Sequence, residues 1–299
     1  MYVVIGATGN TGSVVANKLL AQKQKVRVIG RSADRLQPLA KLGAELFIGN
    51  ITDAGALTRA FTGAQAVYLM LPPDMSSHDV LAHEEQILDA FIPALEKTKV
   101  KHAVALSSIG ADKSEKTGPV IGLHNMEQKL NQISGLNILY LRAGYFMENT
   151  LGQIGIINAM GKTAGPVRGD LKLPMIATRD IGNFAADALL KLDFKGKQTQ
   201  ELLGQRDLEY NEVAAIIGNA ISRPGLEYIA LPDEQTRPAL LQMGMSPNMA
   251  GLILEMSASL NNGHMKPLEK RSPQNTTPTS YEAFVAEEFV PAFHSKQAA

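Results

Sequence analysis

The sequence of 299 residues lacks cysteine, a surplus of charge of either sign and long apolar runs. The absence of cysteine excludes disulfides, thiolate nucleophiles and metal sites with cysteine ligands. Lysine and arginine together number 29, as do aspartate and glutamate, so the net charge is zero. Such a chain has no general electrostatic attraction to nucleic acid or to an anionic membrane. No apolar run approaches the ~18 residues that span a bilayer, so we expect neither kind of partner.

The first strand candidate begins at Tyr2. This start leaves no room for the basic and apolar regions of a signal peptide. The apolar fraction of 45% and the charged fraction of 19% are ordinary for a globular enzyme. Together with the lack of cysteine, which fits a reducing compartment, these features predict a cytoplasmic protein.

The first half of the sequence alternates short apolar segments with amphipathic segments of helical length. The apolar segments are Tyr2–Ile5, Lys25–Ile29, Ala44–Ile48, Ala66–Leu71, Ala103–Ser107 and Leu136–Leu141. Nearly continuous Val, Ile and Leu are typical of parallel strands that are buried on both faces. Gly43, Gly63 and Gly135 stand shortly before three of these segments, where a helix ends in the left-handed conformation. The alternation predicts an α/β fold with a doubly wound, mostly parallel Rossmann sheet.

The alternation loosens after residue 145. Helices are expected over Asp180–Leu190, Asn211–Ile221, Asp233–Met243 and Met249–Leu260, with short strands near Glu201–Leu203 and Leu226–Ala230. The residues Thr279 to Glu282 have the pattern of a capping box and predict a last helix to about Val290. We therefore predict a Rossmann domain over residues 1–145 and a smaller, mixed α/β lobe over residues 146–299. A segment of about 174–195 is expected to return to the first domain.

A glycine loop follows the first predicted strand and opens the first predicted helix. Its glycines are Gly6, Gly9 and Gly12, and Thr8, Asn10 and Thr11 stand between them. A dinucleotide site needs glycine where the chain turns sharply, where the backbone meets the pyrophosphate and where the helix packs on the strand. The N-terminus of the helix then offers free N–H groups and a partial positive charge to the phosphates. The motif in this context predicts that the chain binds a dinucleotide.

Arg31 and Ser32 follow the second predicted strand, where the adenosine ribose of a dinucleotide lies. An acidic residue about 20 positions beyond the loop would favour NAD, but Arg31 lies 19 residues after Gly12 and no acid precedes Asp34. A guanidinium there binds a 2′-phosphate through paired hydrogen bonds. The sequence therefore predicts NADPH as the cofactor.

Other cofactor contacts are expected at the carboxyl ends of the remaining strands, where ligands of such sheets bind. Asn50 is expected near the adenine, and Ser107 nearer the nicotinamide. The remaining candidates are Leu71, Pro72, Tyr145 and Phe146. The last two follow the sixth strand and are expected to line a pocket.

Five motifs together resemble those of the NmrA-like atypical short-chain dehydrogenases. They are the Gly6–Gly12 loop, Arg31, Gly49–Asp53, Leu141–Asn149 and Pro174–Gly182. The resemblance covers nearly the whole chain, including Asn275–Thr279 before the last predicted helix. It implies a Rossmann domain with a small C-terminal lobe and a cofactor on the glycine loop, Arg31 and the strand ends. Members of the family range from NADPH-dependent quinone and isoflavone-type reductases to redox sensors that bind the nucleotide without turnover.

The catalytic pair of ordinary short-chain dehydrogenases is absent, because no tyrosine of this chain has a lysine four residues later. In those enzymes the lysine lowers the tyrosine pKa from ~10, so that the hydroxyl passes a proton near neutrality. His124 takes the tyrosine position and Gln128 the lysine position. Lys129 lies about 100° further around the helix. His124, with an ordinary pKa of ~6.5, is our candidate for a catalytic proton donor.

Two functions fit these features. The first is NADPH-dependent reduction of a small quinone or similar conjugated carbonyl compound, whose delocalised phenolate product can be protonated by water. The second is a non-catalytic regulator that senses NADP(H) and reports to a protein partner. The substrate is expected to be flat and apolar, since methionines at 243, 245, 249 and 256 suit such a surface. A homodimer is compatible with either function. We expect no metal site, because His78 and His83 are five residues apart and do not share a helix face.

Overall fold

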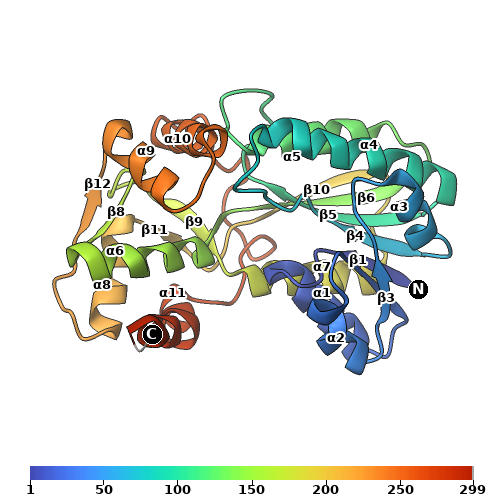
Figure 1. The fold of residues 1–299 in the computed structure, drawn as a ribbon, viewed down its shortest axis with the longest axis horizontal. Coiled ribbons are helices and arrows are strands. Elements are labelled where there is room, and N and C mark those ends of the chain that lie inside the picture. The colour runs from blue at the N-terminus through green and yellow to red at the C-terminus, as the bar shows by residue number, and fades with distance from the viewer. Residues whose placement is uncertain (298–299) are drawn as a thin grey trace.

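A computed structural model describes residues 1–297. Its largest element is a parallel sheet with the strand order β10-β6-β5-β4-β1-β2-β3 (Figure 1). The strands are β1 (Tyr2–Ile5), β2 (Val26–Gly30), β3 (Glu45–Ile48), β4 (Ala66–Leu69), β5 (His102–Ser108), β6 (Asn137–Ala143) and β10 (Lys197–Leu202). Each of the six strands predicted for the first half is present within two residues of its expected bounds. The strand order reverses beside β1, as in a doubly wound sheet, and the predicted fold class is confirmed.

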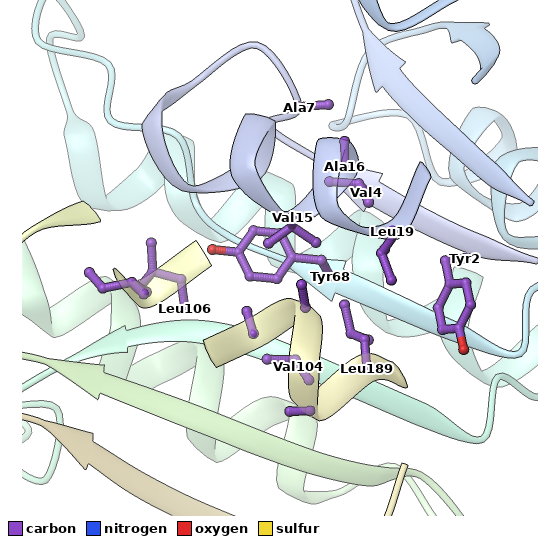
Figure 2. Close-up of a cluster of buried hydrophobic side chains, with 14 of the residues drawn as sticks. Tyr2, Val4, Ala7, Val15, Ala16, Leu19, Tyr68, Val104, Leu106 and Leu189 are labelled. Atoms are coloured by element: carbon purple, nitrogen blue, oxygen red, sulfur yellow. The ribbon is translucent and has the colours of Figure 1, made fainter. Parts of the chain in front are cut away.

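Helices cover both faces of this sheet (Figure 1). They are α1 (Asn10–Ala21), α2 (Ala33–Lys41), α3 (Ala54–Phe61), α4 (Val80–Thr98), α5 (Val120–Asn131) and α7 (Thr178–Lys191). Helices α1, α2 and α7 bury apolar side chains on one face, and α3, α4 and α5 on the other. Figure 2 shows Tyr68 within the first of these clusters, beside Val15 of α1. Gly43, Gly63 and Gly135 all have the positive φ expected of a helix end.

The rest of the chain forms a smaller lobe with its own core around Tyr281, Phe284 and Phe289. Its strands are β7 (Tyr145–Phe146), β8 (Thr163–Gly165), β9 (Leu173–Ile176), β11 (Asp207–Leu208) and β12 (Tyr228–Ala230). They form a three-stranded sheet, β11-β9-β7, and a pair, β12-β8. Its helices are η1 (Met147–Gly152), α6 (Gln153–Met160), α8 (Tyr210–Ala220), α9 (Asp233–Gln242), α10 (Pro247–Asn261), α11 (Tyr281–Phe284), the π-helical η2 (Val285–Phe289) and α12 (Val290–Gln297). The helices predicted after residue 145 are present, but the last one, expected to end near Val290, continues to Gln297.

Two elements of the large sheet come from late in the chain. Helix α7 packs so closely on α1 that a Cβ atom on Gly182 would lie 2.6 Å from Cβ of Val14. Strand β10 pairs in parallel with β6. The sequence predicts a short strand near Glu201–Leu203 in the smaller lobe, and this placement is wrong. The strand is longer and lies at the edge of the large sheet, where its polar side chains reach solvent.

The capping box predicted for the last helix has the wrong N-cap residue. Ser280, and not Thr279, caps α11, because its hydroxyl oxygen accepts a hydrogen bond from the backbone N–H of Ala283. The side chain of Thr279 donates instead to Asp180, in the first turn of α7. The charge of Asp180 favours the first turn of a helix, and its hydrogen bond with Thr279 joins residues that are 99 positions apart.

Candidate nucleotide and substrate site

A large cavity of about 770 Å³ opens at the carboxyl ends of β1, β2, β3 and β4. We call it the loop cavity, because the glycine loop forms part of its wall. The predicted contacts that line it are Gly6, Thr8, Gly9, Arg31, Ser32, Asn50 and Pro72. Sequence reasoning missed other lining residues, among them Arg35, Met70, Asp74, Ser76 and His83. The cavity thus brings together residues from four strand ends and from the start of α4.

Each glycine of the loop meets a different steric requirement. Gly6 has φ +69°, which L side chains rarely adopt, and accepts a hydrogen bond from the N–H of Gly9 at 2.9 Å. Gly9 is exposed and faces the loop cavity. Gly12 is buried where α1 meets β1, and a Cβ atom there would collide with the carbonyl of Gly6. These are the turn, the close approach and the packing contact that a dinucleotide loop requires.

The N-terminus of α1 fits a phosphate ligand. Helices α2, α3 and α4 are each capped by a side chain, those of Ser32, Asp53 and Asp79. Helix α1 begins after Gly9 with no capping side chain and no acidic residue in its first turn. Its first N–H groups and the positive end of its dipole therefore remain available to an anion at the cavity wall.

Two other loop residues have different surroundings. The side chain of Thr11 is buried, and its oxygen accepts a hydrogen bond from the hydroxyl of Tyr68 at 2.9 Å. Asn10 is exposed at the start of α1. Neither residue lines the loop cavity, and the Thr11 hydroxyl holds α1 against the sheet through its contact with Tyr68.

Two arginines stand at the end of the loop cavity formed by β2. Arg31 and Arg35 both line it, and Arg31 is exposed. Neither guanidinium has an ion pair or hydrogen-bond partner within residues 1–297. The hydroxyl of Ser32 caps α2 by accepting from the N–H of Arg35, which fixes both arginines relative to the strand end. Arg35 lies in the first turn of α2, and its place in the helix that begins at this strand end was the signal that could have identified it.

The predicted contacts at β3 and β4 differ in what they present to the loop cavity. Asn50 lines it and accepts a hydrogen bond from the N–H of Thr52 at 3.2 Å. Pro72 also lines it, but Leu71 is buried in the core beneath and does not. The Leu71 side chain therefore does not face the loop cavity, because it packs between the sheet and the helices. Met70 forms the wall close to Gly6 instead.

A second cavity, of about 130 Å³, lies at the carboxyl ends of β5 and β6. We call it the apolar cavity. Its walls come from segments that are far apart in sequence: Ser108, Ile109, Ala143, Gly144, Tyr145, Leu171, Lys172, Leu173, Pro174, Met256, Leu260, Gly263, Met265, Lys266 and Pro267. Tyr145 lies in it as predicted. Of the methionines named from the sequence, Met256 lines it, whereas Met243 is exposed and Met249 is buried elsewhere.

The neighbours of Tyr145 are aromatic. Its ring meets that of Tyr210 edge-on at 6.1 Å, and Tyr210 stacks on Tyr228 at 4.7 Å. Burial raises the pKa of the Tyr145 hydroxyl above its ordinary value, so this group stays protonated at neutral pH. Phe146 packs against the core under α1 and α7, and it lines neither the loop cavity nor the apolar cavity.

The hydroxyl of Ser107 is turned away from both cavities. It is buried and donates to Oε1 of Glu127 at 2.6 Å. The same carboxylate receives two hydrogen bonds from the Arg142 guanidinium, at 3.0 and 2.6 Å, which raise the pKa of that arginine. A buried carboxylate requires such partners. The Ser107 hydroxyl is therefore occupied by Glu127, and Ser108 is the serine that lines the apolar cavity.

His124 lies on α5, and its side chain is half-buried. Its Nδ1–H donates to the carbonyl of Ala111 at 2.8 Å, and the residue lines neither the loop cavity nor the apolar cavity. Lys129 pairs with Glu85 and Asp89 of α4, and Gln128 is exposed. Helix α5 thus has no pair of side chains that takes the place of the Tyr–Lys pair. The hydrogen bond to Ala111 is enough to explain the position of the His124 side chain.

Within residues 1–297, no group of three or more histidine, cysteine, aspartate or glutamate side chains is arranged to hold a metal ion. In the same part of the chain, no helix has both the length and the hydropathy that a membrane crossing requires.

Known proteins resemble this chain in sequence and in fold. An NAD(P)H azoreductase from Xenophilus azovorans is 30% identical over 260 residues, which are 86% of each chain. The structure of an NADPH-dependent quinone oxidoreductase from Escherichia coli superposes with a TM-score of 0.79 at 22% identity, covering 98% of this chain and all of the other. NmrA, a negative transcriptional regulator solved with NAD, superposes with a TM-score of 0.66 at 17% identity, over 99% and 97% of the two chains.

Residues 2–289 match the NmrA-like family, and the chain belongs to that family.

Proposed function

We propose that this protein is an NADPH-dependent oxidoreductase that reduces a small quinone or similar conjugated carbonyl compound. The observation that carries the proposal is the pair of cavities on one edge of the sheet. The loop cavity covers the ends of β1 to β4, and the apolar cavity covers the ends of β5 and β6. A dinucleotide that crosses the switch point beside β1 places its nicotinamide toward the second of these.

The residues of the loop cavity account for cofactor binding. Gly9 and the start of α1 would hold the pyrophosphate, and Arg31 and Arg35 would hold a 2′-phosphate on the adenosine ribose. The 2′-phosphate of NADPH would meet two guanidinium groups that have no other partner within residues 1–297. NADH lacks this phosphate and would leave both guanidinium groups without a partner. This difference supports NADPH over NADH.

When bound, the reduced nicotinamide supplies a hydride. The apolar cavity excludes water from the acceptor, and its leucine, proline and methionine walls orient a flat ring. Hydride addition to a quinone gives a phenolate whose charge is delocalised, so water at the cavity mouth can supply the single proton that completes the hydroquinone. The chain therefore needs no dedicated acid for this acceptor, which agrees with the place of His124 outside both cavities.

The names of two comparison proteins, an NAD(P)H azoreductase and a quinone oxidoreductase, support an acceptor of this type. The test is the oxidation of NADPH by the purified chain in the presence of a series of quinones, followed by its near-ultraviolet absorbance. Turnover with at least one quinone is the expected result. Tight binding of NADPH without turnover of any quinone would overturn the proposal.

The second candidate function is a regulator that binds NADP(H) without turnover. It is favoured by one observation, the absence of a Tyr-x-x-x-Lys pair together with the hydrogen bond that occupies His124. It predicts NADPH and NADP⁺ affinities that differ, and no turnover with quinones or ketones.

A further inference from the structure

The lining of the apolar cavity includes positive charge that the packing of its walls does not require. Two lysines, Lys172 and Lys266, belong to its lining, and no aspartate or glutamate does. Lys172 precedes β9 and Lys266 follows Met265, so the two cations approach the cavity from separate segments. The chain as a whole has zero net charge, so two cations without an acid at one small cavity are a local surplus.

Nearby carboxylates are committed to other partners. Asp170, two residues before Lys172, receives two hydrogen bonds from Arg168, at 3.0 and 2.7 Å. Glu201 accepts from the backbone N–H groups of Leu268 and Glu269, both at 2.9 Å. Within residues 1–297 neither Lys172 nor Lys266 has a carboxylate within 4 Å, since neither occurs in an ion pair. Their charges therefore remain free for a ligand.

The segments that carry the lysines are held in place. The N–H of Met265 donates to Ser259 at 3.1 Å, and the contacts of Glu201 fix the backbone just after Lys266. On the other side, Leu173 pairs with Leu208 in the sheet of the smaller lobe. Both lysines are exposed, so their flexible stems can follow the apolar wall while the ammonium groups stay at the mouth.

These cations do not serve the cofactor. The loop cavity and the apolar cavity share no lining residue, and the former has its own arginines and helix N-terminus for the phosphates. We propose that the acceptor is a flat ring with an anionic substituent, a sulfonate or carboxylate, which Lys172 and Lys266 hold at the mouth of the apolar cavity. The inference rests on the proposed reductase function and names the class of its substrate.

The experiment compares 1,4-benzoquinone with 1,4-benzoquinone-2-sulfonate as acceptors for NADPH oxidation by the full chain. In the double variant Lys172→Gln/Lys266→Gln, kcat/KM for the sulfonate is expected to fall about 10-fold, mostly through KM, because two ammonium groups near one anion are lost. Any loss with the neutral quinone is expected to be several-fold smaller than the loss with the sulfonate, since the neutral quinone meets no charge at the mouth. Lys172→Glu/Lys266→Glu should lower the sulfonate value further.

Lys195→Gln is the matched control, because Lys195 is exposed and lies outside the apolar cavity. It should change neither acceptor. The advantage of the sulfonate in the wild type should also shrink as salt rises, since screening acts over about 10 Å at 0.1 M. Equal effects of the double glutamine variant on both acceptors would overturn the inference and leave the reductase function standing. No oxidation with either quinone would overturn the reductase function, and the inference with it.

Discussion

Asp180 and Thr279 join the first turn of α7 to the segment that leads into α11. Both are buried, and the Asp180 carboxylate accepts from the N–H of Thr279 at 2.9 Å and from its hydroxyl at 2.8 Å. A buried carboxylate with two short donors is a strong contact, and its removal leaves those donors without partners. The pair thus fixes the last part of the chain to a helix of the large sheet.

We predict that Asp180→Ala lowers the free energy of unfolding by about 3 kcal/mol, because a buried hydroxyl and a backbone N–H lose their acceptor. Urea denaturation followed by circular dichroism measures this change. Asp187→Ala is the control on the same helix, since its ion pair with Lys18 is exposed and contributes less than about 1 kcal/mol. Equal effects of the two substitutions would show that the buried pair contributes no more to the free energy of unfolding than the exposed ion pair does.

Gly9→Val is expected to abolish NADPH binding in a protein that still folds. The branched side chain would occupy the wall where the pyrophosphate approaches, but it meets only the Gly6 carbonyl, at 3.3 Å from its Cβ atom. Titration calorimetry measures the affinity, and circular dichroism confirms the fold. Gly12→Ala should instead destabilise the fold, because its Cβ would collide with the same carbonyl. Unchanged NADPH affinity in folded Gly9→Val protein would exclude this loop as the site.

Cofactor choice depends on Arg31 and Arg35. Arg31→Ala should weaken NADPH binding by about 1.5–3 kcal/mol, the usual value of a hydrogen bond to a charged group. Arg35→Ala should act in the same direction, and NADH affinity should be nearly unchanged in both variants. Calorimetry with each cofactor distinguishes these outcomes. A wild type that prefers NADH, or variants that lose both cofactors equally, would show that the arginines do not bind a 2′-phosphate.

Quinone reduction should largely survive the loss of His124. General acid catalysis contributes about 10²–10⁴-fold, so His124→Ala should lower kcat/KM by far less than 100-fold if water protonates the product. The measurement is NADPH oxidation at several pH values between about 6 and 8, compared between the wild type and His124→Ala. A fall of 100-fold or more, with loss of the pH dependence, would identify His124 as the proton donor.

Glu84 should make stability depend on pH. Its side chain is buried on α4 against Gly122, and its Oε2 has no hydrogen-bond partner in residues 1–297. Burial raises its pKa from the ordinary 4.5 to about 7. The protonated Glu84 carboxyl therefore contributes to the free energy of unfolding. This contribution is complete below about pH 4.5, the ordinary pKa, and is lost as the pH rises through the folded-state pKa of about 7. The loss amounts to about 3 kcal/mol, because each pKa unit is worth about 1.4 kcal/mol.

Glu84→Gln should therefore be more stable than the wild type above pH 7 and should lack this part of the pH dependence. Urea denaturation at pH 5 and pH 8 measures both effects. Glu96→Gln on the same helix is the control, because Glu96 is exposed. Parallel stability curves for the wild type and Glu84→Gln would mean that the buried carboxyl does not titrate in this interval.

The sequence by itself determined the parallel sheet and the glycine loop. Strands buried on both faces must be apolar along their whole length, so hydropathy identified β1 to β6. Gly6 adopts a positive φ and a Cβ atom on Gly12 would collide with the carbonyl of Gly6, while Gly9 faces the loop cavity, and the spacing of the three glycines follows from the geometry of one turn. Arg31 could also be predicted from the sequence, since its distance from the loop is set by one helix and one strand.

Only the tertiary structure decided which side chains meet at the site. Strand β10 escaped full prediction because an edge strand is half exposed and its sequence is polar. Ser107 and His124 have residue types that suit a site, but Glu127 and the carbonyl of Ala111 take their hydrogen bonds. The apolar cavity joins Tyr145, Lys172 and Met265, which are separated by tens of residues. Contacts between such distant segments depend on how the chain returns on itself, and no local pattern records that.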